Sequence, residues 1–432
     1  MMGAAGPPSI VFYGDDFTGA TDALGTAARA GLRTLLFLAV PDDAQLQRAG
    51  ALDCIGIAGA ARSMPPDTMR AELAPVAALF RRTGARVLHY KCCSTFDSAP
   101  EVGSIGVAVE ALRPAVAQPW VAVIGGQPEL QRYCLFGNLF AAAGYGGAVC
   151  RIDRHPTMSR HPVTPMHEAD LRRHLALQGF EGVQSLPYLA YARAAAAVQA
   201  DIETLVGQGT GAILFDVAQQ SDLAVIGAAL QARAQAGPLL AVGPSSVLQA
   251  LAQQRAPAAP VPVAAAEGPV LVLAGSLSPV TARQVAAARS YELVPLDARA
   301  LADAAPSHLD AVASQLSARL AAGRNVLACT APGAADPEVP ALALAKAGGL
   351  LLARVLAATP LKRVGVAGGD TSSHAVQALD AWGLSYLAAL SPGAALCRLH
   401  SDAPSLDGCE ILLKGGQMGG EDVLERLVHG TR

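Results

Sequence analysis

Lysine is scarce in this chain of 432 residues, and other features that would place it in a common class are missing. Four of the 32 basic residues are lysine, and the formal net charge of −3 gives no bulk positive field for nucleic acid or an anionic membrane. Apolar stretches are interrupted before they reach the roughly 20 residues of a membrane span, and residues 1–9 lack the basic start of a signal peptide. We therefore predict a cytoplasmic protein that binds neither nucleic acid nor membrane.

Three further absences exclude whole classes of site. The eight cysteines include no Cys-x-x-Cys pair, which excludes the usual zinc and disulfide patterns and predicts buried thiols. No Gly-x-x-x-x-Gly-Lys-Ser/Thr loop occurs, so the chain has no Walker A motif. No Gly-x-Gly-x-x-Gly follows the first apolar run, which disfavours a Rossmann oxidoreductase.

What is present is a large apolar fraction arranged in a regular alternation. Apolar residues make up 52% of the chain, which is too long for one ordinary domain of roughly 100–200 residues. Short apolar runs alternate with stretches of helical period, which predicts two α/β domains with largely parallel sheets and an active site in the cleft between them. Residues 254–269 are rich in proline and alanine, so we predict domains at 1–253 and 270–432 joined by this linker. The predicted strands lie at 10–13, 34–38, 54–58, 87–90, 121–124, 212–215, 239–242, 270–273, 293–295, 325–329, 363–366 and 410–413.

Glycine-rich turns follow predicted strands of the second half. In parallel sheets such turns lead into helix N-termini, whose free N–H groups bind phosphate. Each turn alone is typical of ordinary strand–helix connections, but together they favour a nucleotide site in which Asp370 holds or orients a metal-bound phosphate. Lys414 either enters this site or is a solvated surface charge. The turns are Gly275-Ser276, Gly368-Gly369-Asp370-Thr371 and Gly415-Gly416, and helices are expected at 281–289 and 374–381.

Two adjacent carboxylates end the first predicted strand. Asp15 and Asp16 are followed by Thr18 at the first turn of a helix, in the sequence Gly-Asp-Asp-Phe-Thr-Gly. Acids at this position can accept a substrate proton or bind sugar hydroxyls. Either Asp16 or Thr18 caps the helix, which leaves Asp15 as the candidate catalytic base.

Two more strand ends carry polar groups that suit a small polyhydroxy acid. Arg62 follows the strand at 54–58, and Lys91 comes directly after the strand at 87–90. Lys91 is interpreted as a point charge for a substrate carboxylate, with a salt bridge to Asp97 as the alternative. The loop after it offers hydroxyls and a carboxylate at Ser94, Thr95 and Asp97.

The segment 151–171 contains three histidines at six-residue intervals. Prolines follow two of them and the spacing matches no compact zinc motif, so no metal site is predicted. We expect a proline-braced loop that carries Arg160, His161 and Thr164 into the active site. Residues 164–168 are interpreted as a capped start of a helix over 170–177.

These motifs together resemble the four-carbon acid sugar kinase family. The resemblance rests on Gly-Asp-Asp-Phe-Thr-Gly-Ala-Thr-Asp at 14–22, Gly-Ser-x-Ser-Pro-Val-Thr at 275–281, Gly-Gly-Asp-Thr-Ser at 368–372 and Lys-Gly-Gly at 414–416. The segments 90–98 and 159–166 look like the 3-oxo-tetronate kinase branch. The family implies an N-terminal sugar-acid domain, a C-terminal nucleotide domain and ATP-dependent phosphorylation of the terminal O4 hydroxyl, giving a 3-oxo-tetronate 4-phosphate in carbohydrate metabolism. A threonate or erythronate kinase of the same family and a non-catalytic sugar-acid binder are the alternatives.

The resemblance also assigns residues, with ATP and Mg²⁺ as cofactors and a homodimer as the expected assembly. Two turns depart from the family pattern: Lys-Gly-Gly-Gln-Met-Gly at 414–419 and Gly-Pro-Ser-Ser at 243–246. ATP would be held by Ser276, Gly368, Gly369, Asp370, Thr371, Gly415 and Gly416. The acid would be held by Arg62, Lys91, Ser94, Thr95 and Asp97, and we add Asp16, Thr18, Arg160 and His161 from their positions, with Asp15 as the base.

Overall fold

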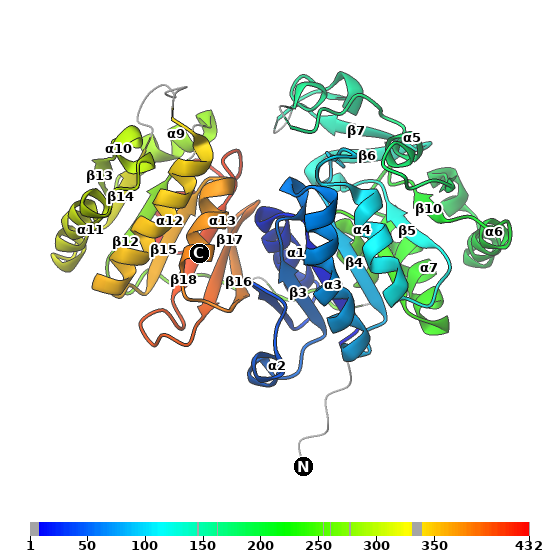
Figure 1. Ribbon diagram of the computed structural model, residues 1–432, viewed down its shortest axis with the longest axis horizontal. Helices are drawn as coiled ribbons and strands as arrows, with labels where there is room; N and C mark the ends of the chain where they lie inside the picture. Colours follow the sequence, from blue (N-terminus) through cyan, green and yellow to red (C-terminus); the bar gives the residue numbers. More distant parts are fainter. Residues whose placement is uncertain are drawn as a thin grey trace, which may run out of the picture. The chain divides into compact units, whose positions relative to one another are not determined.

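The chain folds into two compact α/β units. A computed structural model describes residues 8–144, 147–161, 163–253, 255–259, 261–275, 278–330 and 339–431. The N-terminal unit comprises residues 1–35 and 39–258, and the C-terminal unit comprises residues 36–38 and 259–432. Each contains a mainly parallel sheet covered by helices (Figure 1), which confirms the predicted fold class. The expected location of the active site in a cleft between the domains stays a prediction.

The sheet of the N-terminal unit is parallel, with the order β3-β1-β4-β11-β5-β10-β9 and with β2 beside β3. Its central strands are buried along their whole length, as expected for strands covered by helices on both faces. The strands are β1 (Ile10–Gly14), β2 (Thr34–Phe37), β3 (Cys54–Ala58), β4 (Val87–Lys91), β5 (Val121–Ile124), β9 (Val183–Leu186), β10 (Ala212–Phe215) and β11 (Leu239–Gly243).

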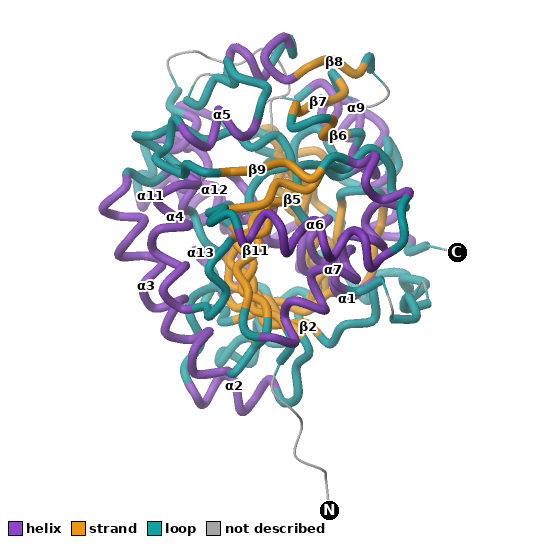
Figure 2. Tube along the Cα trace, turned by 90° about the vertical axis from the view of Figure 1, so that its right-hand side faces the viewer, coloured by secondary structure: helices purple, strands orange, loops and turns teal. Residues whose placement is uncertain are grey.

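Helices cover both faces of this sheet. Figure 2 shows α3 and α4 on one side of β5 and β11, and α6 and α7 on the other. The longest helix of this unit, α3, has a proline at its start and is followed by Gly84, whose φ of 68° is the left-handed conformation that glycine favours. The helices are α1 (Phe17–Arg29), α2 (Asp43–Ala49), α3 (Pro66–Thr83), α4 (Ile105–Leu112), α5 (Leu171–Ala176), α6 (Ala195–Gly207), α7 (Asp222–Ala236) and α8 (Ser246–Leu251).

A second, three-stranded antiparallel sheet follows β5. It consists of β6 (Arg132–Leu135), β7 (Asn138–Ala142) and β8 (Val149–Arg151), none of which was predicted from the sequence. The carboxylate of Asp216 anchors this sheet by accepting backbone N–H bonds from Phe136 (2.6 Å) and Gly137 (2.9 Å). The small sheet is thereby fixed against the end of β10, close to the carboxyl edge of the main sheet.

The sheet of the C-terminal unit has the order β13-β14-β12-β15-β18-β17-β16. Its strands are parallel except for β17, which pairs antiparallel with both β16 and β18. The strands are β12 (Val270–Ala274), β13 (Glu292–Pro295), β14 (Val326–Cys329), β15 (Arg363–Ala367), β16 (Gly383–Ser391), β17 (Ala394–His400) and β18 (Glu410–Lys414). The helices are α9 (Pro279–Ala287), α10 (Ala298–Ala302), α11 (Pro306–Ala321), α12 (Ala341–Ala358), α13 (Gly369–Ala378) and α14 (Val423–His429).

Three predicted helix boundaries were wrong. The helix predicted at 281–289 begins at Pro279, because Ser278 accepts the Val280 N–H as its cap. The helix predicted at 374–381 begins at Gly369, directly after the glycine turn, and ends at Ala378. No helix begins at 164–168, because α5 starts at Leu171 with Asp170 as its cap.

One helix of the described residues, α12, has the length and apolarity of a membrane span. Its mean hydropathy is 1.7 over 18 residues, and 44% of these are buried within the protein. It packs against α10, α11 and α13 of its own unit. This packing is the environment of a core helix.

Candidate functional site

The carboxyl ends of neighbouring parallel strands bring the polar residues of the N-terminal unit together. Gly14 at the end of β1 lies in register with Ala58 of β3 and with Lys91 of β4. Asp15 therefore emerges beside Lys91, and its backbone N–H donates to the Lys91 carbonyl (3.0 Å). The same edge carries Arg62, in a short 3-10 helix over Ala61–Ser63 after β3. Three predicted site residues from three strands thus lie together, as the carboxyl edge of a parallel sheet requires.

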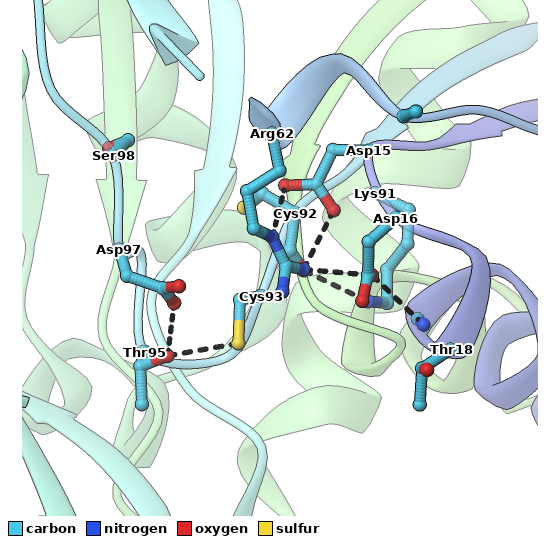
Figure 3. Close-up of polar contacts among 12 residues, drawn as sticks. Asp15, Asp16, Thr18, Arg62, Lys91, Cys92, Cys93, Thr95, Asp97 and Ser98 are labelled. Carbon is cyan, nitrogen blue, oxygen red and sulfur yellow. Dashed lines mark hydrogen bonds and ion pairs between the residues drawn. The ribbon is translucent and has the colours of Figure 1, made fainter. Parts of the chain in front are cut away.

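Arg62 joins the two adjacent carboxylates. Its Nη2 lies 2.9 Å from Oδ1 of Asp15 and 2.8 Å from Oδ1 of Asp16, and its Nε donates to Oδ2 of Asp15 (3.3 Å). Figure 3 shows the guanidinium between the two acids. Asp15 is nearly enclosed at 3% exposure, whereas the Asp16 side chain is 28% exposed. The more buried acid therefore accepts two hydrogen bonds from Arg62 and the more accessible acid accepts one.

Burial and charge act in opposite directions on this cluster. Burial raises the pKa of the Asp15 carboxyl above its ordinary value; Asp16 acts in the same direction, and the cations Arg62 and Lys91 oppose it. For Lys91, burial alone would lower the pKa, but the nearby carboxylates Asp16, Asp15 and Asp22 outweigh it and the pKa is raised. Lys91 therefore carries a positive charge at neutral pH, although the residue is buried with 3% exposure.

The start of α1 packs closely against Lys91. Asp16 is the cap of this helix, because its Oδ1 accepts the Gly19 N–H (2.9 Å). A Cβ at position 19 would lie 2.6 Å from Nζ of Lys91 and 2.4 Å from Oδ1 of Asp16, so a side chain there would displace one of these two groups. The Nζ itself donates to the Cys92 carbonyl (3.0 Å). The alternative interpretation of Lys91, a salt bridge to Asp97, is wrong, because no such ion pair is found among the described residues. The carboxylates that raise the pKa of Lys91 are instead Asp15 and Asp16, after β1, and Asp22 of α1.

A second row of polar residues lies behind Lys91. Oδ2 of Asp22, on α1, accepts from the hydroxyl of Ser245 (2.5 Å) and from Nε2 of Gln127 (3.5 Å). Ser245 follows β11 and Gln127 follows β5, so the row continues along the same carboxyl edge. Neither residue was predicted as part of the site: Asp22 ends the motif at 14–22 but lies within the helix after it, and Gln127 is a single polar residue with no motif around it.

The loop after β4 forms a chain of short hydrogen bonds. Thr95 Oγ1 donates its one proton to Asp97 (2.5 Å) and therefore accepts from the thiol of Cys93 (2.9 Å). Figure 3 shows this chain beside the Arg62 cluster. Ser98 is tied down differently, by Gln178 Nε2 (2.8 Å) and His174 Nε2 (2.9 Å) from the α5 region. Ser94, Thr95 and Asp97 are all buried within this loop.

Six predicted substrate residues are not joined to the Arg62 cluster by any hydrogen bond or ion pair of the described residues. Three of them are Ser94, Thr95 and Asp97 of the loop after β4, and the others are Thr18, Arg160 and His161. Thr18 lies on α1 with its hydroxyl away from Arg62 (Figure 3). Arg160 is exposed, and Nδ1 of His161 accepts the Thr164 N–H (3.1 Å) within its own loop. His155 is also structural, since its Nδ1 accepts backbone N–H bonds from residues 157 and 158. Among the residues that the structure describes, no group of three His, Cys, Asp or Glu could hold a metal ion.

In the C-terminal unit, the glycine turns meet at a second carboxyl edge. Strands β14, β12, β15 and β18 are neighbours, and their ends are linked by backbone hydrogen bonds from Gly275 to Ala367 (3.0 Å) and from Gly368 to Lys414 (2.9 Å). Gly368 has a φ of 136° and precedes α13, whose first-turn N–H groups have no partner within the helix and receive no hydrogen bond from a capping side chain. A Cβ on Gly275 would lie 2.4 Å from Oγ1 of Thr371, so the two turns are in direct contact.

Lys414, the last residue of β18, is a buried cation. It is 1% exposed, which excludes the interpretation as a solvated surface charge. Its Nζ donates to Oγ1 of Thr281 (3.1 Å), and Oγ1 of Thr281 donates to the Gly416 carbonyl (2.9 Å). Burial lowers the pKa of Lys414 to about 8, and no carboxylate of the described residues offsets this effect.

The other predicted nucleotide residues that the structure describes lie at the same edge. Gly369, Asp370 and Thr371 form the first turn of α13, where Asp370 is exposed and Thr371 is buried. Gly415 and Gly416 follow Lys414 directly. Ser276 lies outside the described residues.

Comparison with known proteins divides the chain in the same two parts. A family model described as "Sugar-binding N-terminal domain" matches residues 10–251, and one described as "Nucleotide-binding C-terminal domain" matches residues 271–424. A 3-oxo-isoapionate kinase of Paraburkholderia graminis is 38% identical over 95% of this chain and 92% of its own length. A 3-oxo-tetronate kinase of Methylobacterium radiotolerans is 35% identical over 50% of this chain and 49% of its own length.

Solved structures share the fold over nearly the whole length. A Salmonella typhimurium LT2 protein, described as a tRNA synthase, covers 96% of this chain with a TM-score of 0.80 and 25% identity, and the match spans 98% of that protein. A Haemophilus influenzae protein covers 96% of this chain with a TM-score of 0.75 and 23% identity, again over 98% of its own length.

Proposed function

Because the chain belongs to the four-carbon acid sugar kinase family and is therefore a phosphotransferase, we propose that it transfers the γ-phosphoryl group of ATP to the terminal hydroxyl of a small 3-oxo sugar acid. One observation carries this proposal. Each unit has its own carboxyl edge with a buried cation, and the two edges differ in kind. The N-terminal edge offers carboxylates and hydroxyls for a polyhydroxy substrate, whereas the C-terminal edge offers glycine N–H groups and Lys414 for phosphates.

In this proposal, the N-terminal edge binds and orients the sugar acid. Asp15 accepts the proton of the attacking hydroxyl, since each carboxylate oxygen keeps a free lone pair beside its bond from Arg62. The raised pKa of Asp15 makes it a stronger base than an exposed aspartate, and the hydrogen bonds from Arg62 hold its orientation. Thr95 and Asp97 supply hydroxyl and carboxylate oxygens for the substrate hydroxyls.

The C-terminal edge fits ATP by its backbone and by its charge. Glycine is needed at 275, where a Cβ would meet Oγ1 of Thr371, and is favoured at 368 by the φ of 136°. Turns without side chains at these positions let backbone N–H groups approach phosphate oxygens. Lys414 would neutralise a phosphate that reaches it. Asp370, exposed in the first turn of α13, would hold Mg²⁺, which neutralises phosphate charge when bound. The residues that form this edge are Gly368, Gly369, Asp370, Thr371, Lys414, Gly415 and Gly416.

The most specific part of the proposal is which sugar acid the protein phosphorylates. The sequence favours a 3-oxo-tetronate, whose O4 would be phosphorylated. The match over almost the full length, however, is to a 3-oxo-isoapionate kinase, whereas the 3-oxo-tetronate kinase matches over half of the chain. We therefore place 3-oxo-isoapionate first in order of testing, followed by the 3-oxo-tetronates and then threonate and erythronate. The named kinases disfavour the non-catalytic binder, while the cytoplasmic location and the homodimer stay predictions.

An ATP-coupled assay of the purified chain against this panel of acids tests the proposal. We expect ADP release with Mg²⁺ that depends on one 3-oxo acid and exceeds the release with threonate or erythronate. Turnover of threonate or erythronate alone would support the alternative kinase of the same family. ADP release that no acid stimulates would contradict the proposed function.

A further inference from the structure

The carboxylates of the N-terminal edge already neutralise Arg62 and Lys91, the two cations that were predicted from the sequence to bind the substrate. Arg62 bonds both Asp15 and Asp16, and the charge of Lys91 is balanced by Asp16, Asp15 and Asp22. The edge thus holds more carboxylates than cations. A sugar acid that enters it adds a further negative charge, which needs a cation that no protein carboxylate uses.

Arg132 is a cation of this kind. It is the first residue of β6, and its backbone exchanges two hydrogen bonds with Gln127 (2.9 and 3.2 Å). The side chain of Gln127 reaches Asp22 in the row behind Lys91. The start of the small sheet is thereby fixed at the carboxyl end of β5, on the same edge as the Asp15 cluster.

The guanidinium of Arg132 is incompletely paired. Its Nη1 donates to the Leu130 carbonyl (2.5 Å) and weakly to the Gln131 carbonyl (3.4 Å). Its Nε is buried and has no hydrogen-bond partner in the part of the chain that the structure describes, and no carboxylate there forms an ion pair with it. Burial lowers the pKa of Arg132, and the thiol of Cys93, which lies in the Thr95 chain of the site, opposes this. Arg132 is thus a half-buried guanidinium whose Nε lacks a partner and which forms no ion pair with a carboxylate of the described residues. A guanidinium of this kind on the same edge as the substrate site is expected to receive an anion from the substrate.

We propose that Arg132 binds the carboxylate of the sugar acid and so selects acids over neutral sugars of the same shape. The planar guanidinium can bond both oxygens of a carboxylate, which the ammonium of a lysine does less specifically. This inference rests on the proposed function. It replaces Lys91 with Arg132 as the partner of the substrate carboxylate and leaves Lys91 to hold Asp15 and Asp16 in place.

Kinetics with a matched pair of substrates test this role. The wild-type protein and the Arg132→Gln variant are compared on the panel acid with the highest kcat/KM and on its primary amide. We expect Arg132→Gln to raise KM for the acid on the order of a hundredfold, with a much smaller change in kcat. The preference for the acid over the amide should disappear, while the affinity for an ATP analogue stays that of the wild type.

Two further variants keep the test decisive. Arg154→Met removes an exposed arginine near the same small sheet and should leave KM and the acid preference unchanged. If Arg132→Gln does not fold, judged by its thermal melting, Arg132→Lys replaces it, and we expect a raised KM with a weakened acid preference. Wild-type KM and acid preference in the folded variant would overturn the role of Arg132 alone. If the wild-type protein phosphorylates no acid of the panel, the proposed function fails and this inference with it.

Discussion

The Nζ of Lys91 lies where a side chain on residue 19 would begin, since a Cβ there would be 2.6 Å from it. The glycine at the start of α1 therefore determines how closely Lys91 approaches Asp16. The relationship connects a sequence motif, Gly-Asp-Asp-Phe-Thr-Gly, to the charge balance of the N-terminal edge.

Gly19→Ala should accordingly disturb the site more than the fold. The added methyl group must displace Lys91 or Asp16, so we expect kcat/KM for the acid to fall at least tenfold, on the order of the effect of a small misplacement in an active site. Steady-state kinetics and a thermal melt measure the two effects. Gly207→Ala is the matched control, because nothing lies within 4 Å of a Cβ at the end of α6. Equal, near-wild-type activity of both variants would show that the position of Lys91 does not matter.

Replacement of Asp15 tests the general base. In Asp15→Asn the shape of the side chain is kept but it no longer accepts a proton, so kcat should fall by about 10²–10⁴-fold. Binding of an ATP analogue, measured by calorimetry, should change little, because the nucleotide edge belongs to the other unit. A kcat within a few-fold of the wild type would remove Asp15 from this role.

The buried Lys414 predicts a pH dependence of nucleotide binding. Its pKa of about 8 means that the ammonium form, which attracts phosphate, is lost as the pH rises through that value. Affinity for Mg-ATP should therefore be highest below about pH 8 and fall above it, with uptake of a proton on binding in the alkaline range. Calorimetry in buffers of different ionisation enthalpy measures both quantities.

Two lysine variants separate this effect from the titration of the nucleotide itself. Lys414→Met should bind Mg-ATP weakly and without the alkaline fall in affinity. Lys346→Met, which removes an exposed lysine of α12, should keep the wild-type profile. An alkaline fall that persists in Lys414→Met would assign the titration to another group.

The contact between two glycine turns predicts a defect that a second substitution repairs. In Gly275→Ala the new methyl group meets Oγ1 of Thr371 at 2.4 Å and pushes the first turn of α13 outward. We expect the Kd for Mg-ATP to rise about tenfold, the effect of losing roughly one good hydrogen bond. Thr371→Ala in the same chain removes the contacting oxygen and should recover part of the affinity. If Gly275→Ala binds Mg-ATP as the wild type does, this turn does not contact the nucleotide.

Much of the N-terminal site could be predicted because parallel strands end at one edge. Asp15, Arg62 and Lys91 each follow a short apolar run, so the sequence indicates that they meet even though they are far apart in the chain. Most of the parallel strands were predictable for the same reason, since they are continuous apolar runs bounded by glycine or polar residues. The exception in the N-terminal sheet is β9, which was not predicted because it contains the polar residues Gln184 and Ser185.

The parts that could not be predicted depend on tertiary contacts. Strands β6–β8 are short and held by the carboxylate of Asp216 from a distant strand end, so nothing local marks Arg132 as a site residue. Residues 164–168 resemble a capped helix start, but the side chain of Glu168 accepts the Asp170 N–H and the helix begins only after Asp170. The burial of Lys414 is equally invisible in the sequence, because it arises from the packing of Thr281 and the last glycine loop around it.

The central claim is that this chain phosphorylates a 3-oxo sugar acid with ATP, and ³¹P NMR of the complete reaction tests it most directly. With the wild-type protein, Mg-ATP and 3-oxo-isoapionate or a 3-oxo-tetronate, we predict a new phosphate monoester resonance that grows in step with ADP. The same mixture with Asp15→Asn should stay unchanged over that time. Formation of inorganic phosphate in place of the monoester, or no ADP with any acid, would contradict the account.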